Sequence, residues 1–162
     1  MDTVTLLGKA EALLAAARAK RLKLAAAESC TGGMLMACLT ELSGASEVVD
    51  CGFVTYSNAA KHELLGVPFE LIEEYGAVSE PVARAMAEGA LRNSHADIAA
   101  AITGVAGPTG GTADKPVGLV HFAAARRGRE TVSESRRFGD LGRSVVRLRS
   151  VETALELMQS LV

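Results

Sequence analysis

Aromatic side chains are scarce in this 162-residue chain, which has no Trp, two Tyr and four Phe. Hydrophobic residues nevertheless make up 49% of it, so we expect a core of Ala, Val, Leu and Ile. A run of about 18 apolar residues, the length that a membrane-spanning helix needs, is missing as well. Lys9 lies inside the first apolar pattern rather than in a basic patch before it, which argues against a signal peptide. We therefore expect no membrane association.

An excess of one charge is also absent, because 17 basic and 19 acidic residues leave a net charge of -2. This balance does not indicate the basic surface that a nucleic-acid-binding protein presents. The cysteines, Cys30, Cys38 and Cys51, form no CxxC pair and leave an odd count. Such a set is typical of a reduced, cytoplasmic protein without a disulfide framework or a zinc site. We expect neither a metal nor a cofactor.

The chain has no internal repeat, linker or low-complexity segment, and its length suits one domain over residues 1–162. Apolar periodicity and capping signals predict helices over 5–20, 31–42, 58–65, 69–75, from Ser79 onward, and over 141–162. Apolar and β-branched runs predict strands over 22–27, 48–56, 97–103, 117–125 and 131–138. The Ala-rich third strand should be central, and the last two should form a hairpin. This order predicts an α/β fold, a three-layer α/β/α sandwich with a mixed, mostly parallel sheet.

The segment from Glu28 to Gly33 is the most informative one, because it joins a predicted strand to a predicted helix by a tight turn that contains Ser29. Such a turn presents a hydroxyl beside backbone N–H groups that have no intrahelical partner. A nucleophile needs this arrangement, since the N–H groups can receive the charge that develops during attack. The alternative is that Ser29 or Thr31 only caps the helix.

A serine nucleophile needs a base, and Lys61 is the best candidate for it. None of the three histidines stands in the context of a Ser-His-Asp triad, and the G-x-S-x-G pattern is absent. Lys61 follows the end of the second predicted strand, and strand ends of this kind gather at one edge of an open sheet. A lysine acts as a base only when it is neutral, and lowering its pKa to about 7 costs roughly 4–5 kcal/mol. The alternative is a solvated helix lysine.

Two further features could contact a ligand. The segment from Gly104 to Lys115 is rich in glycine, which lets a backbone approach a ligand closely, although it lacks the lysine of a P-loop. A flexible loop is the alternative. Arg136, Arg137 and Arg143 could hold a phosphate or could form a solvated charge cluster.

Five motifs in this order resemble the CinA C-terminal domain family, the nicotinamide-nucleotide amidases, over about residues 5–160. The motifs are Ala27-Glu28-Ser29-Cys30-Thr31-Gly32-Gly33, Tyr56-Ser57-Asn58 with Lys61, Gly76-Ala77-Val78-Ser79, Thr103-Gly104-Val105-Ala106-Gly107-Pro108 with Gly110-Gly111-Thr112, and Lys115-Pro116-Val117-Gly118 with Phe138-Gly139-Asp140 and Arg143. Many relatives have an additional N-terminal domain, so we expect this chain to be the stand-alone form.

The resemblance implies hydrolysis of nicotinamide mononucleotide (NMN) to nicotinate mononucleotide and ammonia, a step in pyridine nucleotide recycling. It implies a Ser/Lys mechanism with Ser29 as nucleophile and Lys61 as base, and Tyr56 is the base to consider if Lys61 is dispensable. The residues expected to bind substrate are Cys30, Thr31, Gly32, Gly33, Asn58, Thr103, Gly104, Gly107, Arg137 and Arg143. The phosphate is expected on either Arg137 or Arg143.

Three other functions remain open at this point. The same turn and glycine loop would serve a non-catalytic module that binds a nucleotide or phosphate. A scaffold domain is the second alternative, and the Ala-rich helices lead us to expect a homo-oligomer in any case. The third is a thiol enzyme that uses Cys30, which adjoins Ser29.

Overall fold

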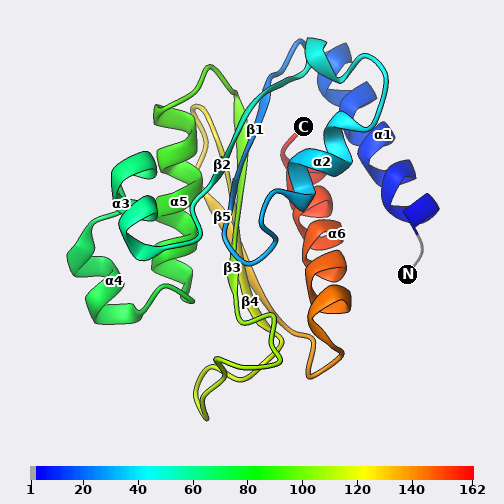
Figure 1. Cartoon of the computed structure of the whole chain (residues 1–162). Helices are drawn as coiled ribbons and strands as arrows, with labels where there is room; N and C mark the ends of the chain where they lie inside the picture. The colour runs from blue at the N-terminus through cyan, green and yellow to red at the C-terminus, as the bar shows by residue number, and fades with distance from the viewer. Residues whose placement is uncertain (1–2) are drawn as a thin grey trace.

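The computed structural model describes residues 3–162 and arranges them in three layers (Figure 1). A five-stranded sheet with the order β2-β1-β3-β4-β5 forms the middle layer. Its strands are β1 (Leu24–Glu28), β2 (Val49–Val54), β3 (Ile98–Gly104), β4 (Leu119–Arg126) and β5 (Val132–Arg137). β1 pairs in parallel with β2 and β3, whereas β4 is antiparallel to both β3 and β5. The mixed sheet, the central third strand and the closing hairpin are confirmed.

Helices cover both faces of this sheet, as predicted (Figure 1). One face carries α1 (Thr3–Ala19), α2 (Met34–Thr40), the short 3-10 helix η1 (Ala45–Glu47) and α6 (Arg143–Leu161). The other face carries α3 (Asn58–Leu65), α4 (Phe69–Tyr75) and α5 (Glu80–Arg92). Among the described residues, no helix combines the length and the apolarity needed to cross a membrane.

The start of α2 and the capping of α5 differ from the prediction. α2 begins at Met34 rather than at Thr31, because Gly32 and Gly33 have φ angles of 58° and 101° and form a left-handed turn before it. Ser79 does precede α5, but it does not cap that helix with its side chain. Its hydroxyl instead donates to the carbonyl of Gly76 at 2.8 Å.

The two faces of the sheet differ in the size of their side chains. Toward α5 the three central strands present alanines over most of their length, in the rows Ala25–Ala99–Ala125 and Ala27–Ala101–Ala123. Toward α1 and α6 they present larger residues such as Ile98, Ile102 and Phe122. This alanine surface lets α5 lie close to the sheet. Gly89 of α5 lets it approach α3 as well, since a Cβ there would lie 2.0 Å from the carbonyl oxygen of Leu65.

At the carboxyl edge of the parallel strands this alanine surface becomes polar. The strand alternation places Thr103 beyond Ala101 and His121 opposite Thr103, on the α5 side. Ser29 and Thr55 continue the same row, because they directly follow the paired residues Glu28 and Val54. Ligand sites of open α/β sheets lie at this edge.

Candidate active site

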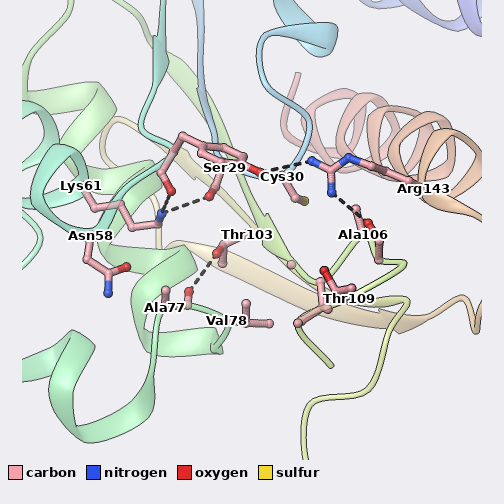
Figure 2. A pocket seen from close by; sticks show the side chains of 15 residues that line it. Ser29, Cys30, Asn58, Lys61, Ala77, Val78, Thr103, Ala106, Thr109 and Arg143 are labelled. Atoms are coloured by element: carbon pink, nitrogen blue, oxygen red, sulfur yellow. Dashed lines mark hydrogen bonds between the residues drawn. The ribbon is translucent and has the colours of Figure 1, made fainter. Parts of the chain in front are cut away.

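A cavity of about 350 Å³ opens at this polar row (Figure 2). Its walls come from five segments of the chain: the turn after β1, the link from β2 into α3, residues 77–78 before α5, the glycine-rich loop after β3, and Arg143 at the start of α6. The volume suits a small-molecule ligand. The strand ends therefore bring together most of the candidate residues, which are spread in the sequence from Ser29 to Arg143.

Ser29 and Lys61 face each other in this cavity (Figure 2). The Nζ of Lys61 lies 3.0 Å from the Oγ of Ser29, 2.9 Å from the carbonyl oxygen of Thr55 and 3.5 Å from that of Tyr56. Lys61 is only 1% exposed, so it is not the solvated helix lysine of the alternative interpretation. Within residues 3–162, no carboxylate forms an ion pair with it.

This environment favours the neutral amine. Burial lowers the pKa of Lys61 below the ordinary value of 10.5, because the charged form loses its hydration. A neutral amine has two N–H donors and one lone pair. The carbonyls of Thr55 and Tyr56 can accept the two donors, which leaves the lone pair for the hydroxyl of Ser29. The geometry therefore suits a base that takes the serine proton.

The turn after Ser29 is held by the preceding residue, Glu28, which is fully buried. One carboxylate oxygen of Glu28 accepts the hydroxyl of Thr31 at 2.6 Å and the N–H groups of Gly33 and Leu35 at 3.2 and 3.0 Å. Its other oxygen accepts the N–H of Met36 at 3.0 Å. The N-terminus of α2 is thus occupied by a carboxylate of the protein itself, which leaves no room there for the phosphate of a ligand.

Most other N–H groups of the turn are also used. Gly32 donates to the carbonyl of Ser29, and Met34 donates to that of Thr31. In the described part of the chain, the N–H groups of Cys30 and Thr31 donate to no backbone or side-chain oxygen. Cys30 lines the cavity directly beside Ser29, so its N–H is a candidate donor for a developing oxyanion. We also expected the N–H groups of Gly32 and Gly33 to contact the substrate, but both already donate hydrogen bonds within the turn.

The Cys30 thiol is not a competing nucleophile. It is 5% exposed, and burial raises its pKa to about 12. A thiol attacks only as the thiolate, which is a negligible fraction near neutral pH at this pKa. The geometry therefore does not favour a thiol enzyme.

The opposite wall of the cavity is built around Thr103 and Arg143. Thr103 donates its hydroxyl to the carbonyl of Ala77 at 2.8 Å, which fixes the segment before α5 (Figure 2). Arg143 donates to the carbonyl of Gly107 at 2.9 Å and to the hydroxyl of Tyr56 at 3.2 Å. Its guanidinium therefore bridges the glycine-rich loop and the β2–α3 link at the mouth of the cavity.

The predicted site residues divide into two groups. Those that line the cavity are Ser29, Cys30, Tyr56, Asn58, Lys61, Thr103, Gly104, Gly107 and Arg143. Those that do not line it are Thr31, Gly32, Gly33 and Arg137. Of the two arginines considered for the phosphate, Arg143 lines the cavity, whereas Arg137, the last residue of β5, does not.

Sequence reasoning gave no role to several residues of the site. Ala77, Val78 and Thr109 line the cavity, and the carbonyl of Thr55 contacts Lys61. Ala77 and Val78 belong to one of the resembling motifs, which was the available signal for them. Two of the histidines are engaged or exposed away from Ser29: His62 stacks on Phe69 with ring centroids 4.0 Å apart, and the side chain of His95 is 97% exposed. Residues 3–162 contain no cluster of side chains suited to a metal ion.

Comparison with known proteins identifies the family of this chain. The family model described as the CinA C-terminal domain matches residues 8–162. The chain belongs to this family. A CinA-like protein from Syntrophus aciditrophicus is 49% identical over 158 residues, which are 98% of this chain and 37% of that protein. A CinA-like protein from Akkermansia muciniphila is 58% identical over 113 residues, 70% of this chain and 27% of that protein. The chain thus spans well under half of these CinA relatives.

Solved structures of CinA proteins match over nearly their whole length. The competence/damage inducible protein CihA from Agrobacterium tumefaciens is 47% identical, with a TM-score of 0.95, over 96% of this chain and 94% of that one. A CinA superfamily protein from Escherichia coli is 36% identical, with a TM-score of 0.93, over 100% of this chain and 93% of that one. The three-layer fold is therefore that of the CinA superfamily.

Proposed function

We propose that this protein is a nicotinamide-nucleotide amidase, which hydrolyses the carboxamide of NMN to nicotinate mononucleotide and ammonia in pyridine nucleotide recycling. The observation that carries the proposal is the contact between Ser29 Oγ and the buried Nζ of Lys61, 3.0 Å apart in a cavity. A neutral lysine beside a serine hydroxyl is an arrangement for nucleophilic catalysis on an acyl group. Family membership supports the choice of substrate.

The reaction would begin with attack of Ser29 Oγ on the carboxamide carbon. Lys61 takes the serine proton as the new C–O bond forms, and the N–H of Cys30 receives the oxyanion. The cationic pyridinium ring of NMN withdraws electrons and makes this carbon more electrophilic. Lys61 then returns the proton to the departing nitrogen as the C–N bond breaks, which releases ammonia. Water hydrolyses the acyl-enzyme and regenerates Ser29.

The mouth of the cavity would hold the rest of the mononucleotide. Arg143 presents the planar guanidinium that suits bidentate binding of a phosphate, and it is already oriented by Gly107 and Tyr56. Tyr56 is 64% exposed and its hydroxyl contacts Arg143, so we assign it to substrate contact rather than to proton transfer. Asn58 lines the same side of the cavity.

The experiment that tests this proposal is an assay of ammonia release from NMN by the wild type and by Ser29→Ala. We expect release by the wild type and a loss of about 10⁴-fold or more in the variant, because the nucleophile is removed. Binding of NMN without release would instead support the non-catalytic binding module. Equal release by both proteins would remove Ser29 from the mechanism.

A further inference from the structure

Glu28 has more hydrogen-bond partners than any other side chain near the site, although the proposed chemistry does not use it. Its carboxylate is fully buried and accepts from one hydroxyl and three backbone N–H groups. An ionised carboxylate accepts such bonds and donates none. No ion pair of Glu28 with a basic side chain occurs within residues 3–162. The first turn of α2 therefore supplies the stabilisation that a buried carboxylate requires.

We propose that Glu28 is a positioning residue, which holds the turn after Ser29 so that the Ser29 hydroxyl stays against Lys61 and the N–H of Cys30 stays available. Glu28 lies at the end of β1, directly before Ser29, and its acceptors reach forward to Gly33, Leu35 and Met36. The side chain thus connects the strand to the helix across the turn that contains Ser29.

A second contact holds the same turn from the other side. The guanidinium of Arg147, on α6, donates to the carbonyl of Thr31 at 3.0 Å. Glu28 therefore binds N–H groups of the turn while Arg147 binds a carbonyl. Among the described residues, the N–H groups of Cys30 and Thr31 donate to no oxygen, and the N–H of Cys30 has only its own thiol as a partner. The turn is thus held so that these two donors adjoin the proposed nucleophile.

The test uses Glu28→Gln, which keeps the size of the side chain but replaces one acceptor oxygen by an NH₂ group that must face N–H donors. The matched control is Asp97→Asn. Asp97 directly precedes the first residue of β3, so it lies at the other end of the strands from Ser29. Its carboxylate accepts the N–H of Lys23 at 2.7 Å. Both variants exchange a carboxylate for an amide at a backbone contact, but only the first affects the turn.

Two readouts are needed, because the role in catalysis rests on the proposed function. Hydrogen exchange of the peptide spanning residues 30–36 reports the turn without any substrate, and we expect faster exchange in Glu28→Gln only. In the ammonia assay we expect kcat to fall about 100-fold in Glu28→Gln, since a small misplacement of reacting groups has an effect of this size. KM should change far less, because Glu28 does not line the cavity.

The outcomes separate the two claims. Wild-type exchange in residues 30–36 of Glu28→Gln, or a kcat equal to that of Asp97→Asn in an active enzyme, overturns the positioning role. Faster exchange in Glu28→Gln with a wild type that releases no ammonia supports the hold on the turn and refutes the amidase. If Glu28→Gln does not fold, Thr31→Val removes one of the four donors, and we expect a smaller loss of kcat, about tenfold. Unchanged kcat and exchange in Thr31→Val would then overturn the proposal.

Discussion

Glu28 and Lys61 are both buried beside Ser29, yet the protein surrounds them in different ways. Glu28 receives four hydrogen-bond donors, so its charge is stabilised in place. Lys61 meets one hydroxyl and two carbonyl oxygens, and no carboxylate of residues 3–162 forms an ion pair with it, so burial is the main influence on its protonated form. The difference supports the proposed roles, a positioning role for Glu28 and proton transfer for Lys61.

The largest loss of activity should come from replacing Lys61, the residue that this comparison assigns to proton transfer. We expect Lys61→Met to lower ammonia release at least about 10³-fold, because the general base is lost. Lys61→Arg is the matched variant, since it keeps a long cationic side chain that stays protonated in a protein. It should be equally inactive. Activity above one tenth of the wild type in either variant would show that another group, such as Tyr56, is the base.

The pH dependence of activity follows from the lowered pKa of Lys61. The protonated amine cannot accept the serine proton, so kcat/KM should rise about tenfold per pH unit on the acid side of that pKa. The increase in kcat/KM should level off at a pH below 10.5, because burial lowers the pKa of Lys61 from its ordinary value of 10.5. Steady-state kinetics between pH 5 and pH 10 would measure it. A rate independent of pH over this range would contradict a lysine base.

The stability of the protein should depend on pH for the same reason. Between the folded pKa of Lys61 and the ordinary value of 10.5, the unfolded chain binds a proton that the folded chain does not. The free energy of unfolding therefore rises with pH in this window, by about 1.4 kcal/mol per unit from this residue. Lys61→Met should remove this slope and be the more stable protein at neutral pH. Denaturant unfolding at several pH values tests it, and identical slopes in the two proteins would contradict a lowered pKa.

The smallest loss of activity should come from replacing Cys30, the third buried titratable side chain at the site. Cys30→Ala should keep turnover within about twofold, since a thiol with a pKa of about 12 supplies no thiolate at neutral pH. Cys51→Ala is the control, because Cys51 lies on β2 and does not line the cavity. A large loss in Cys30→Ala alone would return the thiol enzyme to consideration.

The sequence was sufficient to predict the central position of the third strand and the proximity of Ser29 and Lys61. Ser29 and Lys61 follow the ends of two apolar strands, and neighbouring parallel strands bring such ends together. The Ala-rich third strand was predicted to be central, and its alanines turn out to form the surface on which α5 packs. For these residues, the position expected from the local sequence pattern agrees with the position in the fold.

The role of Glu28 was not predictable in the same way. The backbone N–H groups that donate to it lie five to eight residues ahead, and they come within reach only because Gly32 and Gly33 adopt positive φ angles and turn α2 back over β1. The choice between Arg137 and Arg143 was also beyond the sequence, because both belong to one basic stretch. Only the end of β5 and the start of α6 place them in different surroundings. The homo-oligomer stays a prediction.

The most direct test of the central claim is the pKa of Lys61 itself, measured by NMR titration of its ¹³Cε resonance, with Lys61→Met to assign the signal. We expect a titration below 10.5, because burial disfavours the protonated amine. A Lys61 that titrates at 10.5 or above would be a cation beside Ser29, and it could not act as the base.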